Sequence, residues 1–177
     1  YEGPFEVTSN NGSAFFFQTT TANIRRATVN CISSNSCINL DKSNLFTDRL
    51  TLDLDSAENA ITGMNNSYMK LDNSYFGCPS GNGWPGCLHV SYNSVLQFNS
   101  SRVETINTVG LEAQWNSNIQ LNNGTVTRND QGYQIHLNAS SNLQIQAGIQ
   151  ELNLDCGSQT FIQNQTTLTL SGGCSEY

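Results

Sequence analysis

The tripeptides Leu96-Gln97-Phe98, Ile119-Gln120-Leu121 and Leu143-Gln144-Ile145 repeat one apolar-polar-apolar pattern at steps of 23 and 24 residues. A fourth copy, Leu168-Thr169-Leu170, follows after another 25 residues. Alternation of this kind is typical of a strand that buries one face. Repeats of about 20–50 residues indicate stacked structural units, so the pattern predicts a β-solenoid.

A second apolar position lies eight residues before each recurrent unit. The pairs are Leu88 and Leu96, Leu111 and Ile119, Ile135 and Leu143, and toward the N-terminus Ile61 and Met69, Cys37 and Leu45, Phe16 and Ile24. A further strand of the coil is expected near Leu50–Leu54, Val103–Ile106 and Gln150–Leu154. Asparagine often closes a coil, which predicts a stacked amide ladder at Asn23, Asn44, Asn118 and Asn142.

Seven such coils and a partial eighth account for residues 1–177, which predicts a single all-β domain. No segment shows a sustained 3.6-residue periodicity, so we expect little or no helix. Parallel stacking would place equivalent residues of successive coils about 4.8 Å apart. The predicted fold is therefore a parallel β-helix of about seven coils.

The composition argues against several functional classes. Only 12% of the residues are charged, and the formal net charge is −7. A negative chain without a basic stripe is not expected to bind nucleic acid. No apolar run is long enough to cross a bilayer, and no signal peptide is found, so we expect no membrane span. The chain has the character of a mature exported product or a fragment of one.

Six cysteines occur as three pairs along the sequence. They are Cys31 and Cys37, Cys78 and Cys87, and Cys156 and Cys174. Fifteen pairings are conceivable for six cysteines, and we favour the sequential one because the first four lie close along the chain. Buried free thiols are the alternative. Disulfides would place the protein outside the cytosol.

Six Asn-x-Ser/Thr acceptor sequences agree with an extracellular or cell-surface location. They begin at Asn11, Asn65, Asn99, Asn123, Asn138 and Asn164, all at predicted turns or strand ends. A chain rich in asparagine and serine also produces such sequences by chance. We nevertheless predict a secreted glycoprotein.

The repeat resembles that of the parallel β-helix proteins, which include pectin lyases, polygalacturonases, phage tailspikes and many surface adhesins. The resemblance covers nearly the whole chain but concerns architecture alone. The Asn-Thr-Asp, Asp-Asp, Gly-His-Gly and Arg-x-Lys segments of polygalacturonase-like chains are all absent. The resemblance implies a right-handed coil, the commoner hand among solenoids with three strands per coil.

The repeat register predicts one column of titratable residues. His89, Glu112 and His136 occupy the same outward position of successive coils. Such a column could bind a divalent metal or transfer protons. The alternative is a solvated polar ladder, and we expect no cofactor beyond this cation.

Two further places could bind a ligand. Asp53 and Asp55 alternate with leucines, so both carboxylates face outward about 7 Å apart, a spacing suited to glycosidases or to Ca²⁺. The alternative is an acidic solvent face. Trp84 lies in the loop between Cys78 and Cys87, where it could stack on a sugar or fold back over the coil.

Scarce charge, disulfides, acceptor sequences and uncapped ends favour a non-enzymatic structural protein. We expect a secreted, glycosylated solenoid that self-assembles through its ends into an extracellular filament, sheath or surface layer. The second hypothesis is a carbohydrate-binding adhesin, or a polysaccharide lyase or hydrolase, that acts through the outer face.

Overall fold

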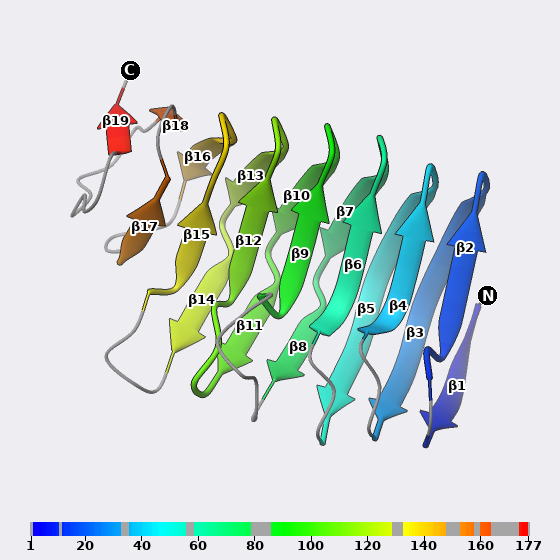
Figure 1. Cartoon of the computed structure of the whole chain (residues 1–177). Helices are drawn as coiled ribbons and strands as arrows, with labels where there is room; N and C mark the ends of the chain where they lie inside the picture. The colour runs from blue at the N-terminus through cyan, green and yellow to red at the C-terminus, as the bar shows by residue number, and fades with distance from the viewer. Residues whose placement is uncertain are drawn as a thin grey trace.

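A computed structural model of the chain describes residues 2–10, 12–32, 36–55, 59–78, 86–128, 133–147, 153–157, 160–163 and 174–176. Over these ranges the secondary structure consists of strands and contains no helix. Accordingly, no described segment forms a helix able to cross a membrane. The strands pair in parallel in two sheets that follow one axis (Figure 1), which confirms the predicted solenoid.

The smaller sheet receives one strand from each coil. Its members are β2 (Phe15–Gln18), β4 (Ser36–Asp41), β6 (Asn59–Met64), β9 (Leu88–Ser91), β12 (Leu111–Gln114), β15 (Ile135–Leu137) and β17 (Leu154–Cys156). The larger sheet contains the remaining strands. They are β1 (Glu2–Ser9), β3 (Thr21–Cys31), β5 (Asn44–Leu54), β7 (Tyr68–Asp72), β8 (Tyr75–Cys78), β10 (Val95–Asn99), β11 (Arg102–Thr105), β13 (Asn118–Asn122), β14 (Thr125–Arg128), β16 (Asn142–Ala147), β18 (Thr160–Gln163) and β19 (Cys174–Glu176).

The middle coils hold three strands each, as predicted, and the early coils fuse two of them. Strands β3 and β5 are long and change direction at Arg26 and Arg49, where φ is 53° and 57°. The two halves of β5 pair separately with β7 and β8. The larger sheet therefore forks at β5.

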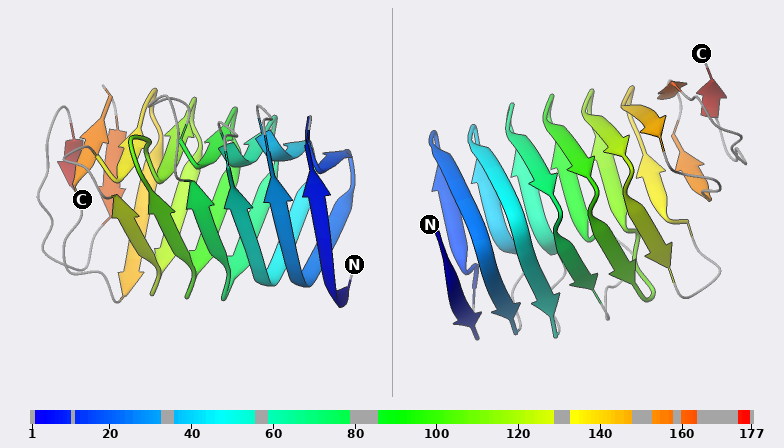
Figure 2. Two further views of the ribbon diagram at one scale, coloured as in Figure 1. Left: turned by 90° about the horizontal axis from the view of Figure 1, so that it is seen from below. Right: turned by 180° about the vertical axis from the view of Figure 1, so that it is seen from behind.

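The coil is right-handed. In Figure 1 the chain rises along the near face through β2, β4 and β6, and descends along the far face while it advances from right to left. The view from behind in Figure 2 shows the same path, with β3 descending on the near side. Upward travel in front combined with leftward advance defines a right-handed screw.

The predicted register holds through the middle of the chain. Leu96 pairs with Ile119, and Ile119 with Leu143. Likewise Leu88 pairs with Leu111. All five side chains are fully buried. Residues 23 or 24 apart are therefore direct neighbours in the core, and each column of like residues excludes water along the axis.

The register predicted for the first coils is wrong by one or two residues. Ile38, not Cys37, pairs with Ile61, and Phe15, not Phe16, pairs with Ile38. In the same way Ala22, not Ile24, pairs with Leu45. The first corners are one residue shorter than the later ones because they contain a different turn.

The turns differ in the number of left-handed residues at the corner. The early corners have a single residue with positive φ, Thr19 or Lys42, whereas the later ones have two in succession, as at Asn65 and Asn66. Asparagine tolerates this conformation better than most residues. A spacing of eight residues between strands holds only where the corner has two such residues.

The last coil also departs from the prediction. Leu154 was expected in the second strand of its coil but pairs with Ile135 in the smaller sheet. Ile162 pairs with Leu143 after only 19 residues. Ile162 therefore takes the place in the column that was expected for Leu168, which lies outside the described residues.

The amide ladder lies elsewhere than predicted. Asn23 pairs with Phe46, so it does not stack on Asn44, and of the four predicted members only Asn118 and Asn142 are direct neighbours. The observed ladder lies at the C-terminal ends of β7, β10 and β13. Asn122 Nδ2 donates to Asn99 Oδ1 at 2.7 Å, and Asn99 Nδ2 donates to Asp72 Oδ1, also at 2.7 Å.

Buried serines form a second ladder just after the corner. The N–H of Ser67 donates to Ser94 Oγ at 3.0 Å, and the N–H of Ser94 donates to Ser117 Oγ at 3.2 Å. Ser94 Oγ in turn donates to the carbonyl oxygen of Ser91 at 2.7 Å. Each hydroxyl thus satisfies one donor and one acceptor that the turn removes from the sheet.

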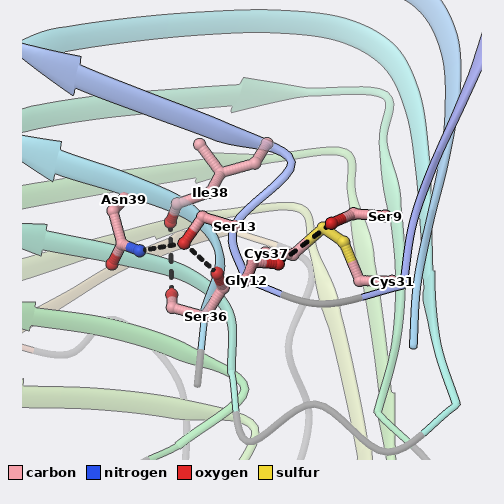
Figure 3. The surroundings of a disulfide bond; sticks show 8 residues. All are labelled: Ser9, Gly12, Ser13, Cys31, Ser36, Cys37, Ile38 and Asn39. Atoms are coloured by element: carbon pink, nitrogen blue, oxygen red, sulfur yellow. Dashed lines mark hydrogen bonds between the residues drawn. A yellow bond between two sulfur atoms is a disulfide. The ribbon is translucent and has the colours of Figure 1, made fainter. Parts of the chain in front are cut away.

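The three predicted disulfides are present, and two occupy equivalent corners. Cys31–Cys37 connects β3 to β4, and Cys78–Cys87 connects β8 to β9 two coils later. Figure 3 shows the first of them beside the previous coil, where Ser13 Oγ donates to the carbonyl oxygen of Ser36. The third, Cys156–Cys174, joins β17 to β19.

The serine ladder makes a testable contribution to stability. Replacing Ser94 with alanine leaves a buried N–H and a buried carbonyl oxygen without their partner, so we expect a loss of about 1–3 kcal/mol in unfolding free energy. Urea denaturation followed by circular dichroism measures this loss. Ser100→Ala, at an exposed position, is the matched control and should change stability little. Equal effects of the two substitutions would contradict the assigned role.

Candidate functional site

The predicted titratable column exists as a row across the smaller sheet. Glu112 in β12 pairs with His89 in β9 and with His136 in β15. The register continues to Thr62 in β6 and to Asp155 in β17. We call these five residues the polar row.

The polar row is covered rather than solvated. Glu112 has no exposed surface, and His136 is 8% exposed. The main chain at Gly86, at the base of the loop closed by Cys78–Cys87, lies against the row: its N–H donates to Glu112 Oε2 at 2.6 Å. The expectation of an outward, solvent-facing column is therefore wrong at its centre, because the main chain at Gly86 lies against it.

Hydrogen bonds keep Glu112 ionised despite its burial. Burial raises its pKa, but the adjacent His136 ring, the nearby His89 ring and the donors of Gly86 and Gln114 outweigh this effect, so the pKa lies below its ordinary value. Burial lowers the pKa of His89, although the charge of Glu112 opposes the shift. The row thus contains a buried carboxylate beside a histidine that resists protonation.

His136 lies between two carboxylates. Its Nδ1 is 3.4 Å from Glu112 Oε1, and its Nε2 is 3.8 Å from Asp155 Oδ2. This geometry does not amount to a metal centre: among the described residues, no group of three or more His, Cys, Asp or Glu could hold a metal ion. A general acid or base must also reach its substrate, which the covering at Glu112 opposes.

The second candidate, Asp53 and Asp55, lies in an open hollow of about 520 Å³ on the outer face. Both residues are exposed, and Asp55 lies one position beyond the end of β5. Asn30 and Ile32 of the preceding coil line the same hollow. The structure therefore brings the two predicted carboxylates to one place, beside residues that lie more than twenty positions earlier in the chain.

A second hollow of about 120 Å³ shares Asp53 and adds a carboxylate that sequence reasoning missed. Gly77 pairs with Asp53 on one side and with Glu104 on the other. A Cβ atom at Gly77 would lie 2.7 Å from Asp53 Oδ1, so the absence of a side chain opens a notch between the two acids. Tyr75 borders this notch. We call the two hollows together the acidic groove.

Tyr75 and Glu104 are coupled within the acidic groove. Tyr75 Oη donates to Glu104 Oε2 at 2.9 Å, and Arg102 forms an ion pair with the same carboxylate. Burial, followed by this hydrogen bond, raises the pKa of Tyr75. Glu104 occupies the same position of its strand as Asp53 two coils earlier, and that equivalence was the available signal in the sequence.

An exposed aromatic pair lies at a corner of the solenoid. The rings of Tyr92 and Trp115 are stacked, with centroids 4.5 Å apart and an interplanar angle of 12°. They are 45% and 44% exposed. Trp84, the aromatic residue that the sequence singled out, lies outside the described residues. The signal for the pair was the recurrence of an aromatic residue after 23 positions.

The described acceptor asparagines fall into two kinds. Asn65 Nδ2 donates to Asp41 Oδ1 at 2.8 Å, and Asn99 Nδ2 lies in the amide ladder described above. Asn123 and Asn138 are exposed. The remaining two predicted sites, at positions 11 and 164, lie outside the described residues.

Comparison with known proteins adds no functional assignment. No protein-family model, no curated protein and no solved structure matches this chain. The functional argument therefore depends on the residues themselves.

The polar row predicts that stability falls on acidification in two steps. The pKa of His89 is lowered from 6.5 in the folded state, so the unfolded chain takes up this proton first and stability starts to fall below about pH 6.5. The pKa of Glu112 is lowered from 4.5, so its contribution is complete above that pH and is lost as the pH falls further. Urea denaturation between pH 8 and pH 3 measures both steps.

Glu112→Gln tests the second step. We expect a loss of about 1–3 kcal/mol at pH 7 and a flatter stability profile below pH 4.5. Glu6→Gln is the matched control, because Glu6 is exposed and also accepts a hydrogen bond, from Asn30 Nδ2 at 2.9 Å. An unchanged profile in the Glu112 variant would refute the assignment of this step to the polar row.

Proposed function

We propose that this protein is a secreted, glycosylated structural protein whose solenoid associates end to end in an extracellular filament, sheath or surface layer. The observation that carries the proposal is the incomplete burial of core-facing side chains in β1 and β2, the first described strands. Supporting features are the three disulfides, which suit an oxidising compartment.

Side chains of β1 and β2 that face the core are only partly covered. Phe15 and Phe17 of β2 pair with Ile38 and Leu40, which are fully buried, but the two phenylalanines are only half-buried. The same contrast holds in the larger sheet, where Val7 of β1 is half-buried above the fully buried Val29. Another coil stacked here would complete these columns.

The edge strands add unpaired backbone to this apolar surface. Among the described strands, β2 is the last of the smaller sheet, and β1 pairs with β3 alone. Exposed edges of this kind invite pairing with another chain. By contrast, Leu154 of β17 and Ile162 of β18, near the other end, are fully buried. We therefore assign the surface formed by β1 and β2 as one interface of self-association. A filament or layer needs a second interface as well.

Association is tested with serine substitutions on the two faces of β2. Phe15→Ser combined with Phe17→Ser removes inward apolar surface, so we expect at least about tenfold weaker self-association. Phe16→Ser is the matched control, because Phe16 is 62% exposed and lies on the other face of the strand. Sedimentation velocity over a range of concentrations, with negative-stain microscopy, measures the assembly state.

Circular dichroism must show that both variants remain folded. A wild-type chain that stays monomeric at millimolar concentration would refute association through this end. Equal weakening by the inward and outward substitutions would refute the assignment to the core columns.

The second candidate function is binding or cleavage of an extracellular polysaccharide, and the acidic groove favours it. Asp53 and Glu104 flank a notch with a tyrosine at its border, an arrangement that could contact sugar hydroxyls. Glu104→Gln should abolish binding or release of reducing sugar on a pectin and alginate panel and leave assembly unchanged. No binding and no product with the wild-type chain would dismiss this candidate.

A further inference from the structure

We propose that Asn138 carries an N-linked glycan whose first sugar stacks on the aromatic pair of Trp115 and Tyr92. This inference rests on the secreted and glycosylated part of the proposed function, not on self-association. It also separates the acceptor asparagines, which the sequence alone treats alike.

The asparagines at 65 and 99 are poor acceptors in the folded protein. Each uses Nδ2 to donate to a carboxylate of the preceding coil, Asp41 or Asp72. A glycan on Nδ2 would replace one of its two N–H groups and place a bulky sugar against the neighbouring coil. Modification there would therefore disturb a hydrogen bond that links successive coils.

Asn138 has the opposite arrangement. Its Oδ1 accepts the N–H of Ala139 at 2.8 Å, which fixes the orientation of the amide. A Cβ atom at Gly157, in the next coil, would lie 2.3 Å from this oxygen, so only glycine leaves room for it. No described residue accepts a hydrogen bond from Asn138 Nδ2, and the side chain is exposed. The attachment atom is therefore available.

The aromatic pair and Asn138 lie at neighbouring corners in the register. Ala113 pairs with Leu137, so Gln114 lies beside Asn138 and Trp115 beside Ala139. The N–H of Asn116 donates to the carbonyl oxygen of Ala139 at 3.0 Å, which holds the two corners together. Tyr92 stacks on one face of the indole ring, and Ala139, the register neighbour of Trp115 in the next coil, is too small to cover the other. A pyranose ring attached at Asn138 can occupy this uncovered face.

The acceptor assignment is tested by secreting the full chain from eukaryotic cells and mapping its peptides. Enzymatic removal of the glycan converts a modified asparagine to aspartate, which mass spectrometry detects. We expect Asn138 and Asn123 to be modified in most molecules and Asn65 and Asn99 in few. An unmodified Asn138 beside a modified Asn123 would overturn this inference and leave the glycoprotein proposal intact; no modification anywhere would overturn both.

The stacking is tested by the accessibility of Trp115. In a Trp84→Phe background, Trp115 is the only tryptophan, and acrylamide quenching of its fluorescence reports the exposure of its ring. With the Asn138 glycan present, we expect quenching to fall by roughly half relative to the enzymatically deglycosylated protein. The matched control is Asn138→Gln, which keeps the Asn123 glycan and should show no change on deglycosylation. Equal quenching with and without the Asn138 glycan would overturn the stacking.

Discussion

The structure depends on hydrogen bonding between successive coils in one parallel register. Each coil satisfies the backbone of the next, so a residue's environment is set by the residues one coil before and one coil after it, which lie 23 or 24 positions away in the middle of the chain. At the corners, where the sheet is interrupted, side chains provide the hydrogen bonds between successive coils. The serine ladder after the corner and the ladder of Asp72, Asn99 and Asn122 at the strand ends continue the pairing through hydroxyl and amide groups. The low charge of the chain agrees with this design, since stacked like charges would repel.

This register explains why chemically active side chains collect in rows. The polar row and the acidic groove each combine residues from three or more coils, and neither is visible as a local motif. Their surroundings differ. The main chain at Gly86 covers Glu112, whereas Gly77 leaves Asp53 and Glu104 open to solvent. One row therefore holds the main chain at Gly86 against the sheet, and the other remains available to a ligand.

The open N-terminal coil and the aromatic corner follow from the same principle. A column in the middle of the solenoid has neighbours on both sides, and a column at an end has one. Phe15 and Phe17 are only half-buried for this reason and not because of their own chemistry. Trp115 is exposed on one side because Ala139 follows it in the column, where a larger residue would have covered the ring.

Several features were determined by the sequence alone. The recurrence of Leu96, Ile119 and Leu143 specified the parallel stack, and the close spacing of the first four cysteines favoured the sequential pairing that the structure shows. Only the tertiary structure decided the residue register of the first coils, the shorter length of the last coil and the burial of Glu112. The physical reason is that periodicity reports which residues share a column, whereas the length of a corner depends on how many of its residues adopt positive φ. The burial of Glu112 depends on the side-chain contact with the main chain at Gly86, which the repeat does not predict.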